Sequence, residues 1–217
     1  MGNPRREADL FSRGVGAEHP QFVSAVARAF SVLRCVEHGV HYLGNQDSAR
    51  PLMREFADTV QAAVMLGAAD GLRMVLLDIC QGDPTFQLKL EPGARVPHGS
   101  TALGRADLAA RPAEVFDARL AELQRDCEAA AWPRIRAGIL QAREDYARYG
   151  FCFSLGDWNP EVFAVGVPLI CADRSRVLVF NCSGRIATMT RERLLQDIGP
   201  RLVALRNTVF ERTQGRF

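Results

Sequence analysis

The stretch FCFSLGDWNPEVFAVGVPLICADRSRVLVFNC, residues 151–182, contains three apolar runs separated by two turns. The runs are short and rich in Val, Leu and Phe, which is typical of strands. Residues 156–160 and 172–175 supply the Gly, Asp, Asn, Pro and Ser that favour turns. Because short turns join antiparallel neighbours, the stretch predicts three antiparallel strands. They cover residues 151–155, 162–171 and 177–182.

A second set of strands is predicted earlier in the chain. Residues 61–66 are small and apolar, residues 72–79 are rich in Val, Leu and Met, and residues 85–90 alternate apolar with polar side chains. Residues 68–71 have the composition of a hairpin turn, and residues 81–84 read Gln-Gly-Asp-Pro. Together these features predict a three-stranded antiparallel meander.

Helical patterns lie before, between and after the two sets of strands. Separate runs of strands and helices are typical of an α+β fold. The sequence therefore predicts an α+β domain whose antiparallel sheet is covered by helices on one face and adjoins a cavity on the other. The first predicted helix covers residues 22–38, and the second starts at Asp47 or Ser48, after a turn at 44–47, with Pro51 in its first turn. A third helix is capped by Ser100 or Thr101 and ends near Leu108. A long helical region follows at 114–148 with a break at Trp132, and the last helix is capped by Thr190.

Composition places the chain among ordinary globular proteins. Its 217 residues are 47% hydrophobic and 24% charged, and this length can bury a core without metals or disulfides. No apolar run approaches the ~18 residues of a membrane helix, and no apolar segment follows the N-terminal arginines as in a signal peptide. The six cysteines form no CxxC motif and are expected to be reduced. We expect a cytoplasmic protein without a membrane partner.

The sequence contains no recognisable catalytic or cofactor-binding motif, since GxGxxG, GxxxxGKS/T, GxSxG and HExxH are all absent. His38 and His41 are three residues apart, but no third metal ligand accompanies them. The net charge of +2 neither indicates nor excludes nucleic-acid binding. The sequence therefore predicts no catalytic residue, no metal and no cofactor, with an enzyme on a similar fold kept as an alternative.

Residues 93–108 form the first candidate binding segment. A loop rich in Gly and Pro leads into a helix capped by Ser100 or Thr101. The free amides at the start of such a helix favour a carboxylate or another anion. Small residues here would let a ligand approach the backbone, but they would equally let the helix pack tightly on the sheet. The sequence leaves both interpretations open.

The end of the last predicted strand is the second candidate. Alternation along the strand places Asn181 and Ser183 on the same face. Two polar residues on one face of an apolar strand either meet solvent or line a pocket. If they line a pocket, Phe153, Val165 or Val167 could cover a bound ring.

Two segments resemble motifs of the IclR family of transcriptional regulators. GARVPHGSTALGRADLAA, residues 93–110, resembles the motif that opens the family's effector-pocket helix, with Arg105 in place of the usual Lys. Residues 149–184 resemble the distal block of the effector domain, and the resemblance covers about residues 50–213. The matching residues are Gly93, Pro97, Thr101, Ala102, Gly104, Ala106, Leu108 and Ala109 in the first segment and Pro168, Asp173, Ser183 and Gly184 in the second.

This resemblance implies a GAF-like effector-binding domain over residues 47–217. It implies regulation of transcription in response to a small organic acid or an aromatic effector. It also implies a homo-oligomer, either a dimer or a tetramer. By analogy with family positions, the implied ligand-binding residues are Ala102, Leu103, Ser154, Ala164, Gly166, Asn181 and Ser183. Thr101, at the start of the same helix with its free amides, completes the predicted site.

The N-terminal part resembles the family only over a short segment. Residues 22–38 resemble the first helix of its winged helix-turn-helix, and residues 1–19 are predicted to be a flexible tail. In the family this first helix is followed by a recognition helix and a wing. Here residues 43–46 run almost directly into residues 50–52, which match the start of the effector domain. Residues 20–46 are therefore predicted to be a remnant of the DNA-binding module, with impaired DNA binding. The alternative is a stand-alone ligand sensor that acts through oligomerisation without contacting DNA.

Overall fold

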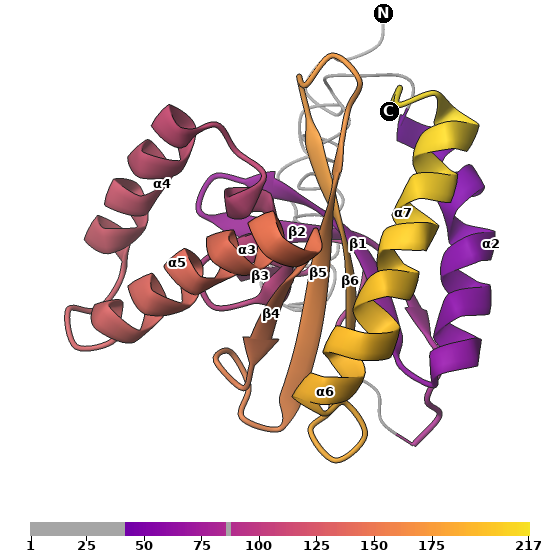
Figure 1. The fold of residues 1–217 in the computed structure, drawn as a ribbon, viewed down its shortest axis with the longest axis horizontal. Coiled ribbons are helices and arrows are strands. Elements are labelled where there is room, and N and C mark those ends of the chain that lie inside the picture. The colour runs from indigo at the N-terminus through magenta and orange to yellow at the C-terminus, as the bar shows by residue number, and fades with distance from the viewer. Residues whose placement is uncertain (1–41, 86–87) are drawn as a thin grey trace, which may run out of the picture.

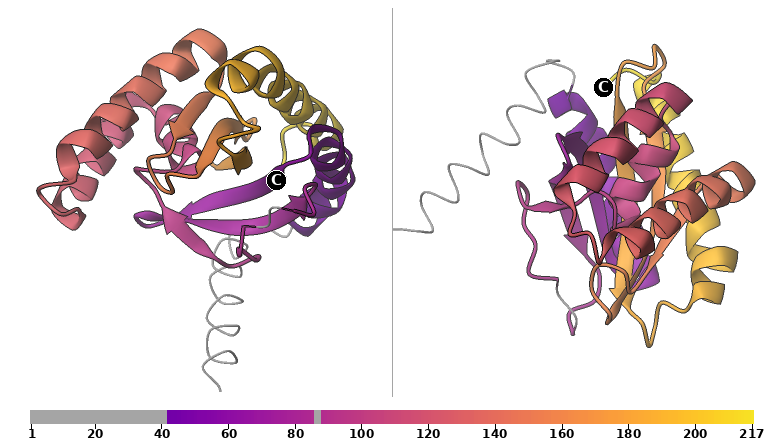
Figure 2. Two further views of the ribbon diagram at one scale, coloured as in Figure 1. Left: turned by 90° about the horizontal axis from the view of Figure 1, so that it is seen from below. Right: turned by 90° about the vertical axis from the view of Figure 1, so that its left-hand side faces the viewer.

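The computed structural model describes residues 42–85 and 88–217 (Figure 1). Its centre is one six-stranded antiparallel sheet with the strand order β3-β2-β1-β6-β5-β4. The sheet is strongly curled, as Figure 2 shows, and the predicted α+β fold is confirmed. The strands are β1 (Ala63–Asp70), β2 (Arg73–Gln81), β3 (Arg95–Pro97), β4 (Cys152–Leu155), β5 (Val162–Ile170) and β6 (Val177–Arg185).

The pairing of β1 with β6 joins the two predicted sets of strands in the middle of the sheet. In this pairing Met65 lies opposite Asn181, and Ala63 lies opposite Ser183. The β1–β2 hairpin is closed at the predicted turn, where Gly71 has a φ of +61° that few other residues adopt. The two polar residues of β6 therefore lie at the centre of the sheet, away from both of its edges.

The third strand of the first set differs from the prediction. Residues 85 and 88–90 form no strand, and the edge of the sheet is instead the short β3, which pairs with β2. Leu88 and Leu90 alternate with polar residues because they line a cavity, not because they pair with a neighbouring strand. The chain returns to β2 where the Gly93 amide donates to the Leu76 carbonyl oxygen at 2.6 Å.

Two long helices, α2 (Tyr42–Val60) and α7 (Gly199–Thr213), cover one face of the sheet and lie side by side (Figures 1 and 2). Met53 of α2 and Leu202 of α7 share one apolar core with the sheet residue Phe180. The short α6 (Arg191–Arg193) and a π-helical turn (Leu194–Ile198) lead into α7. The predicted cap is confirmed, since the Thr190 hydroxyl accepts a hydrogen bond from the Arg193 amide at 3.2 Å.

Helices also cover the other face, so the prediction that helices lie on one face only is wrong. There α3 (Ala102–Ala109) packs on β5 and β6, and α5 (Trp132–Tyr149) packs on α3 and β4. Leu103 and Ala106 of α3 belong to the second apolar core, which closes this face. The remaining helix, α4 (Ala113–Asp126), lies farthest from the sheet in Figure 1.

The first described helix starts earlier than predicted. α2 runs from Tyr42 through the predicted turn at 44–47, and Pro51 lies inside it, not in its first turn. Ala49 and Met53 are buried against the sheet. Packing of this apolar side outweighs the local turn propensity of Gly44-Asn45.

The predicted break between the two helices of the 114–148 region is confirmed. α4 ends at Asp126, and Pro133 lies in the first turn of α5, where a helix tolerates proline. Gly150, with a φ of +79°, ends α5.

The predictions for residues 1–19 and 22–38, and the pair His38 and His41, lie outside the described residues. Residues 20–46 fall mostly outside them as well. No helix in the described part of the chain is long and apolar enough to cross a membrane.

Candidate ligand-binding site

The helix α3 starts at the cap that the sequence predicts. The Thr101 hydroxyl donates to the Pro97 carbonyl oxygen at 2.7 Å and accepts a hydrogen bond from the Gly104 amide at 3.1 Å. These bonds hold the preceding loop against the first turn of the helix. The first amides of a helix have no intrahelical acceptor, so we expect those of Ala102 and Leu103 to be available to a ligand.

Small residues allow α3 to lie very close to its neighbours. A Cβ atom on Gly104 would lie 2.0 Å from the His98 carbonyl oxygen, and one on Gly166 of β5 would lie 2.3 Å from the Ala102 carbonyl oxygen. Neither position has room for a larger residue. The tight-packing interpretation therefore holds for these glycines, and Gly166 borders the backbone of α3.

A small cavity, here called the α3 pocket, lies between the start of α3 and the sheet. Its volume is about 30 Å³, which is room for about one water molecule. The predicted ligand residues other than Gly166 all line it, so four segments that are distant in the sequence meet there. They are Thr101, Ala102 and Leu103 at the start of α3, Ser154 of β4, Ala164 of β5, and Asn181 and Ser183 of β6.

The polar groups of the α3 pocket differ in the hydrogen-bonding capacity that they have left. Ser154 Oγ donates to the Ser100 carbonyl oxygen at 2.7 Å, so its proton is used. Asn181 Nδ2 contacts the Met65 sulfur at 3.9 Å, which is a weak acceptor. Ser183 Oγ is buried without a hydrogen-bond partner. Asn181, Ser183 and the free amides of α3 are therefore the groups that can bind a ligand oxygen.

The apolar wall of the α3 pocket comes from residues other than those predicted. Phe153, Val165 and Val167 belong to the core beneath α7 on the opposite face, because neighbours along a strand point to opposite sides. Trp158, which is 37% exposed, lies at the edge of the pocket. None of the described residues that line the pocket carries a charge. The rest of the wall is Met65, Leu76, Leu88, Leu90, Val96 and Val162.

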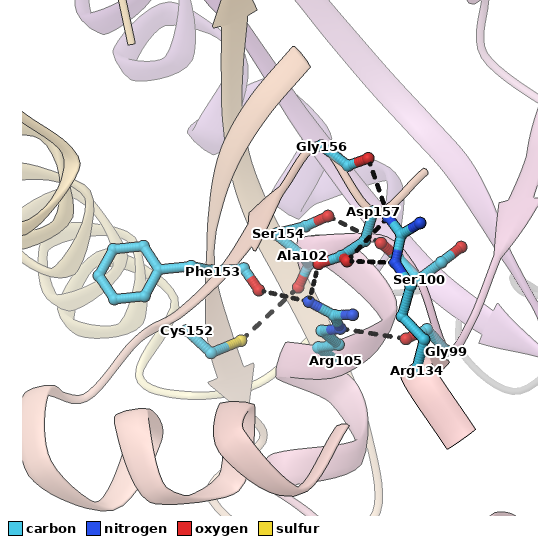
Figure 3. A network of polar contacts seen from close by, with 10 residues as sticks. All are labelled: Gly99, Ser100, Ala102, Arg105, Arg134, Cys152, Phe153, Ser154, Gly156 and Asp157. Carbon is cyan, nitrogen blue, oxygen red and sulfur yellow. Dashed lines mark hydrogen bonds and ion pairs between the residues drawn. The ribbon is translucent and has the colours of Figure 1, made fainter. Parts of the chain in front are cut away.

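A buried arginine ties the start of α3 to β4 (Figure 3). Arg105 is 4% exposed, and it donates from Nε to the Gly99 carbonyl oxygen and from Nη1 to the Phe153 carbonyl oxygen, both at 3.1 Å. Nη1 also lies 2.7 Å from Asp157 Oδ2, and Arg134 lies 3.2 Å from Oδ1 of the same carboxylate. Arg105 therefore shares the Asp157 carboxylate with Arg134, and its Nη2 is buried without a hydrogen-bond partner. The sequence gives no sign of this role, because Phe153 and Asp157 lie 48 and 52 positions further along the chain.

A second buried polar cluster joins the loop before α3 to the last turn of α3. His98 Nε2 lies 2.9 Å from Asp107 Oδ2, and Arg111 Nη2 lies 2.5 Å from Oδ1. Burial by itself raises the pKa of Asp107, but the hydrogen bonds and charges of His98 and Arg111 outweigh it and hold that pKa below its usual value. His98 Nδ1 is buried without a partner. Sequence reasoning missed this cluster too, since nothing local marks His98 as buried.

Two cysteines of the sheet are fully buried. Burial raises the pKa of Cys152 and of Cys182 to about 12, so both thiols stay protonated near neutral pH. Within residues 42–85 and 88–217, no three His, Cys, Asp or Glu side chains gather into a group that could hold a metal ion. What the site offers is a set of neutral hydrogen-bond donors around an apolar cavity.

Comparison with known proteins relates the chain to bacterial regulators. The family model for the bacterial transcriptional regulator IclR C-terminal domain matches residues 38–208. An IclR family transcriptional regulator from Brucella abortus is 36% identical in sequence, with a TM-score of 0.74 over 83% of this chain and 68% of that chain. The search of curated proteins finds no match.

More distant solved structures share the fold. The IclR protein of Thermotoga maritima is 19% identical, with a TM-score of 0.68 over 83% of this chain and 74% of that one. A double mutant of the PobR inducer-binding domain from Acinetobacter, solved in complex with 3-hydroxybenzoic acid, is 17% identical. Its TM-score is 0.54 over 75% of this chain and 96% of that one. Identities this low establish the common fold alone.

Proposed function

Since the chain belongs to the IclR family of bacterial transcriptional regulators, we propose that its α3 pocket binds the small-molecule effector of such a regulator. One observation supports this most directly. Ser183 Oγ is a buried hydroxyl without a partner, and it lines the same cavity as the start of α3 with its free amides. A buried polar group without a partner costs stability, so its retention is explained by a ligand that satisfies it. In this proposal the effector-binding domain spans residues 47–217.

The donors of the α3 pocket favour a small carboxylate on an aromatic or short aliphatic body. The amides of Ala102 and Leu103 lie at the positive end of the α3 dipole, which favours a negative charge. Asn181 and Ser183 add neutral hydrogen bonds from the sheet, and the apolar wall accepts the body of the ligand. The 3-hydroxybenzoic acid bound to PobR is a carboxylate on an aromatic ring, which carries one hydroxyl group.

The size of the α3 pocket adds a condition to this proposal. A volume of about 30 Å³ is far too small for an aromatic acid, so the pocket must widen when the effector enters. Leu88, Leu90 and Trp158 line the pocket from outside the strands, so they can move without breaking the sheet. We expect the effector to displace these residues first.

A thermal-shift screen of aliphatic and aromatic acids tests the proposal. An acid that binds the α3 pocket stabilises the parent by about 2.7 kcal/mol at a hundredfold excess over its Kd. The double variant Asn181→Ala with Ser183→Ala removes both sheet donors without adding volume, so the shift should largely disappear. The matched control Ser175→Ala, in the exposed β5–β6 turn, should keep the full shift. An acid that stabilises the double variant as much as the parent places the effector elsewhere.

We infer further that the chain alone binds no specific DNA site. Support comes from residues 22–38, which resemble the first helix of a winged helix-turn-helix and are followed almost at once by residues that match the effector domain. Fluorescence anisotropy with duplex DNA at two salt concentrations tests this, and we expect weak binding that vanishes near physiological salt. Specific binding in the nanomolar range at ~150 mM salt would contradict it.

The runner-up function is a stand-alone sensor that acts through oligomerisation. Under either reading we propose a cytoplasmic homo-oligomer, a dimer or a tetramer, as the family resemblance implies. Light scattering of the full chain distinguishes this from a monomer. A second experiment mixes the chain with an intact family member and measures the DNA binding of that protein. A change in its DNA binding indicates a sensor that works through partners, and no change indicates one that does not.

A further inference from the structure

Trp158 is the residue at which the α3 pocket meets the solvent. It lines the pocket from the turn between β4 and β5, and it is 37% exposed. Leu90 is half-buried, and the other described residues that line the pocket are buried. A ligand that comes from solvent has to pass a lining residue that solvent also reaches. Trp158 and Leu90 are therefore the candidates for the entrance, and Trp158 is the larger and the more exposed of the two.

The backbone on both sides of Trp158 is held in place. Before it, the carboxylate of Asp157 accepts hydrogen bonds from Arg105 Nη1 at 2.7 Å and from Arg134 Nη2 at 3.2 Å, an arrangement here called the Asp157 clamp (Figure 3). After it, the Asn159 carbonyl oxygen accepts a hydrogen bond from the first amide of β5 at 2.9 Å. The position of the Trp158 indole is therefore set by its neighbours in the turn.

The two arginines of the Asp157 clamp differ in exposure. Arg105 is 4% exposed and also bonds to the Gly99 carbonyl oxygen in the loop before α3. The Arg134 side chain is 69% exposed, and besides Asp157 it contacts the Gly156 carbonyl oxygen at 3.3 Å. Solvent and salt weaken an exposed ion pair far more than a buried one. The contact between α5 and the turn through Arg134 is therefore the part of the clamp that can open while Arg105 stays paired.

We propose that Trp158 is the gate of the α3 pocket and limits the size of the ligand that enters. Arg134 is a positioning residue, which keeps this gate closed by holding Asp157. The inference rests on the proposed function, because it takes the α3 pocket as the ligand site. Outward movement of the indole supplies the room that a cavity of about 30 Å³ lacks.

A thiol placed inside the α3 pocket measures the gate without a known effector. Ser183→Cys puts this thiol on β6, and the full chain is treated with methyl or benzyl methanethiosulfonate, which share one reactive group and differ in size. Tandem mass spectrometry separates labelling at position 183 from labelling of the buried Cys182 beside it. We expect slow labelling of the Ser183→Cys chain, and slower labelling by the benzyl reagent than by the methyl reagent.

Truncation of the gate should remove the discrimination by size. In the Ser183→Cys background, Trp158→Ala should speed labelling by the benzyl reagent roughly tenfold or more, because its ring can lie where the indole was. The methyl reagent should gain less, so the ratio of the two rates changes. The control Ile186→Ala truncates an exposed apolar residue that does not line the pocket, and it should leave both rates unchanged.

Loss of the exposed half of the Asp157 clamp should have a smaller effect in the same direction. Arg134→Met should speed labelling about two- to fivefold, since an exposed ion pair shifts an equilibrium only modestly. Arg134→Lys keeps a charge that can pair with Asp157, so it should restore most of the slow labelling. The control Arg136→Met removes an exposed charge from the same helix and leaves both partners of Asp157 in place, so it should change neither rate.

Three results overturn the proposal. The first is rapid labelling of Ser183→Cys by both reagents, because the pocket is then open without any movement of Trp158. The second is an unchanged ratio of the two rates in Trp158→Ala, and the third is labelling of Arg134→Met that is no faster than that of Arg136→Met. If Ser183→Cys fails to fold, Asn181→Cys, which reduces the side-chain volume in the same pocket, carries the measurement.

Failure of the proposed function gives a different result. In that case no acid raises the stability of the parent in the thermal-shift screen, whatever the labelling rates are. The labelling rates measure access to the α3 pocket, and the screen measures what binds there.

Discussion

The α3 pocket and a second cavity, which is lined by Leu72, Leu123 and Ile135, adjoin the same loop, yet they differ about eightfold in volume, about 30 Å³ against about 250 Å³. The unpartnered Ser183 hydroxyl lies in the smaller of the two. Under the proposed function an effector that enters the α3 pocket must shift its walls, and a binding event that requires movement can be transmitted to other parts of a molecule. The larger cavity has room for a small molecule without such a movement. The comparison therefore favours the smaller pocket as the place where a ligand changes the conformation.

Removing Arg105, which holds the loop before α3 against β4, should give the largest effect. Arg105→Met leaves the carbonyl oxygens of Gly99 and Phe153 without their buried donor and breaks the ion pair with Asp157. We expect a loss of about 3 kcal/mol in the free energy of unfolding, or roughly 6–12 °C in Tm. The matched control is Arg119→Met, which breaks an exposed pair with Glu122 and should cost less than about 0.5 kcal/mol. Equal losses in both variants would show that the framework does not depend on Arg105.

Two serines of the α3 pocket should respond in opposite directions. Ser183→Ala removes a buried hydroxyl without a partner, so it should stabilise the ligand-free protein by about 1 kcal/mol while weakening effector binding. Ser154→Ala removes the donor to the Ser100 carbonyl oxygen and should destabilise by about 1 kcal/mol. Urea unfolding of both variants measures the difference. If Ser183→Ala destabilises as Ser154→Ala does, the Ser183 hydroxyl has a partner, such as a bound water.

Acid should affect the cluster of His98, Asp107 and Arg111 and spare the α3 pocket. The folded-state pKa of Asp107 lies below its ordinary value of 3.8, so its pairing stabilises the fold above that value and is lost as the pH falls through the folded-state pKa. The stability gap between the parent and Asp107→Asn should therefore shrink as the pH falls below about 5. No lining residue of the α3 pocket titrates, so the effect of Ser183→Ala should not change over this range. A constant gap for Asp107→Asn would show that its carboxylate contributes no pH-dependent stability.

Sequence predicted the features that local patterns specify. The cap at Thr101, the break before Pro133 and the strands of the C-terminal half each depend on a few adjacent residues. The shared face of Asn181 and Ser183 followed from strand alternation alone. What remained beyond prediction depends on contacts between distant segments.

The predictions that failed, and the residue roles that the sequence did not indicate, depend on these contacts between distant segments. β3 is only three residues long and contains Pro97, so its pairing with β2 overrides a local signal for a loop. The helix through Gly44 and Asn45 forms because the rest of α2 packs on the sheet. The roles of Arg105 and His98 need partners that only the folded chain brings within reach. The volumes of both cavities also depend on contacts between segments that are distant in the sequence.

The central pairing of β1 with β6 also sets the order in which the molecule can assemble. Met65 and Asn181 are 116 positions apart, whereas the β1–β2 and β5–β6 hairpins close over short turns. Closing a long loop costs chain entropy before the stabilising contacts form. The hairpins should therefore form first and the central pairing late. A chain emerging from the ribosome therefore carries an unpaired β1 edge during much of its synthesis. The floor of the α3 pocket comes into existence only when β6 docks.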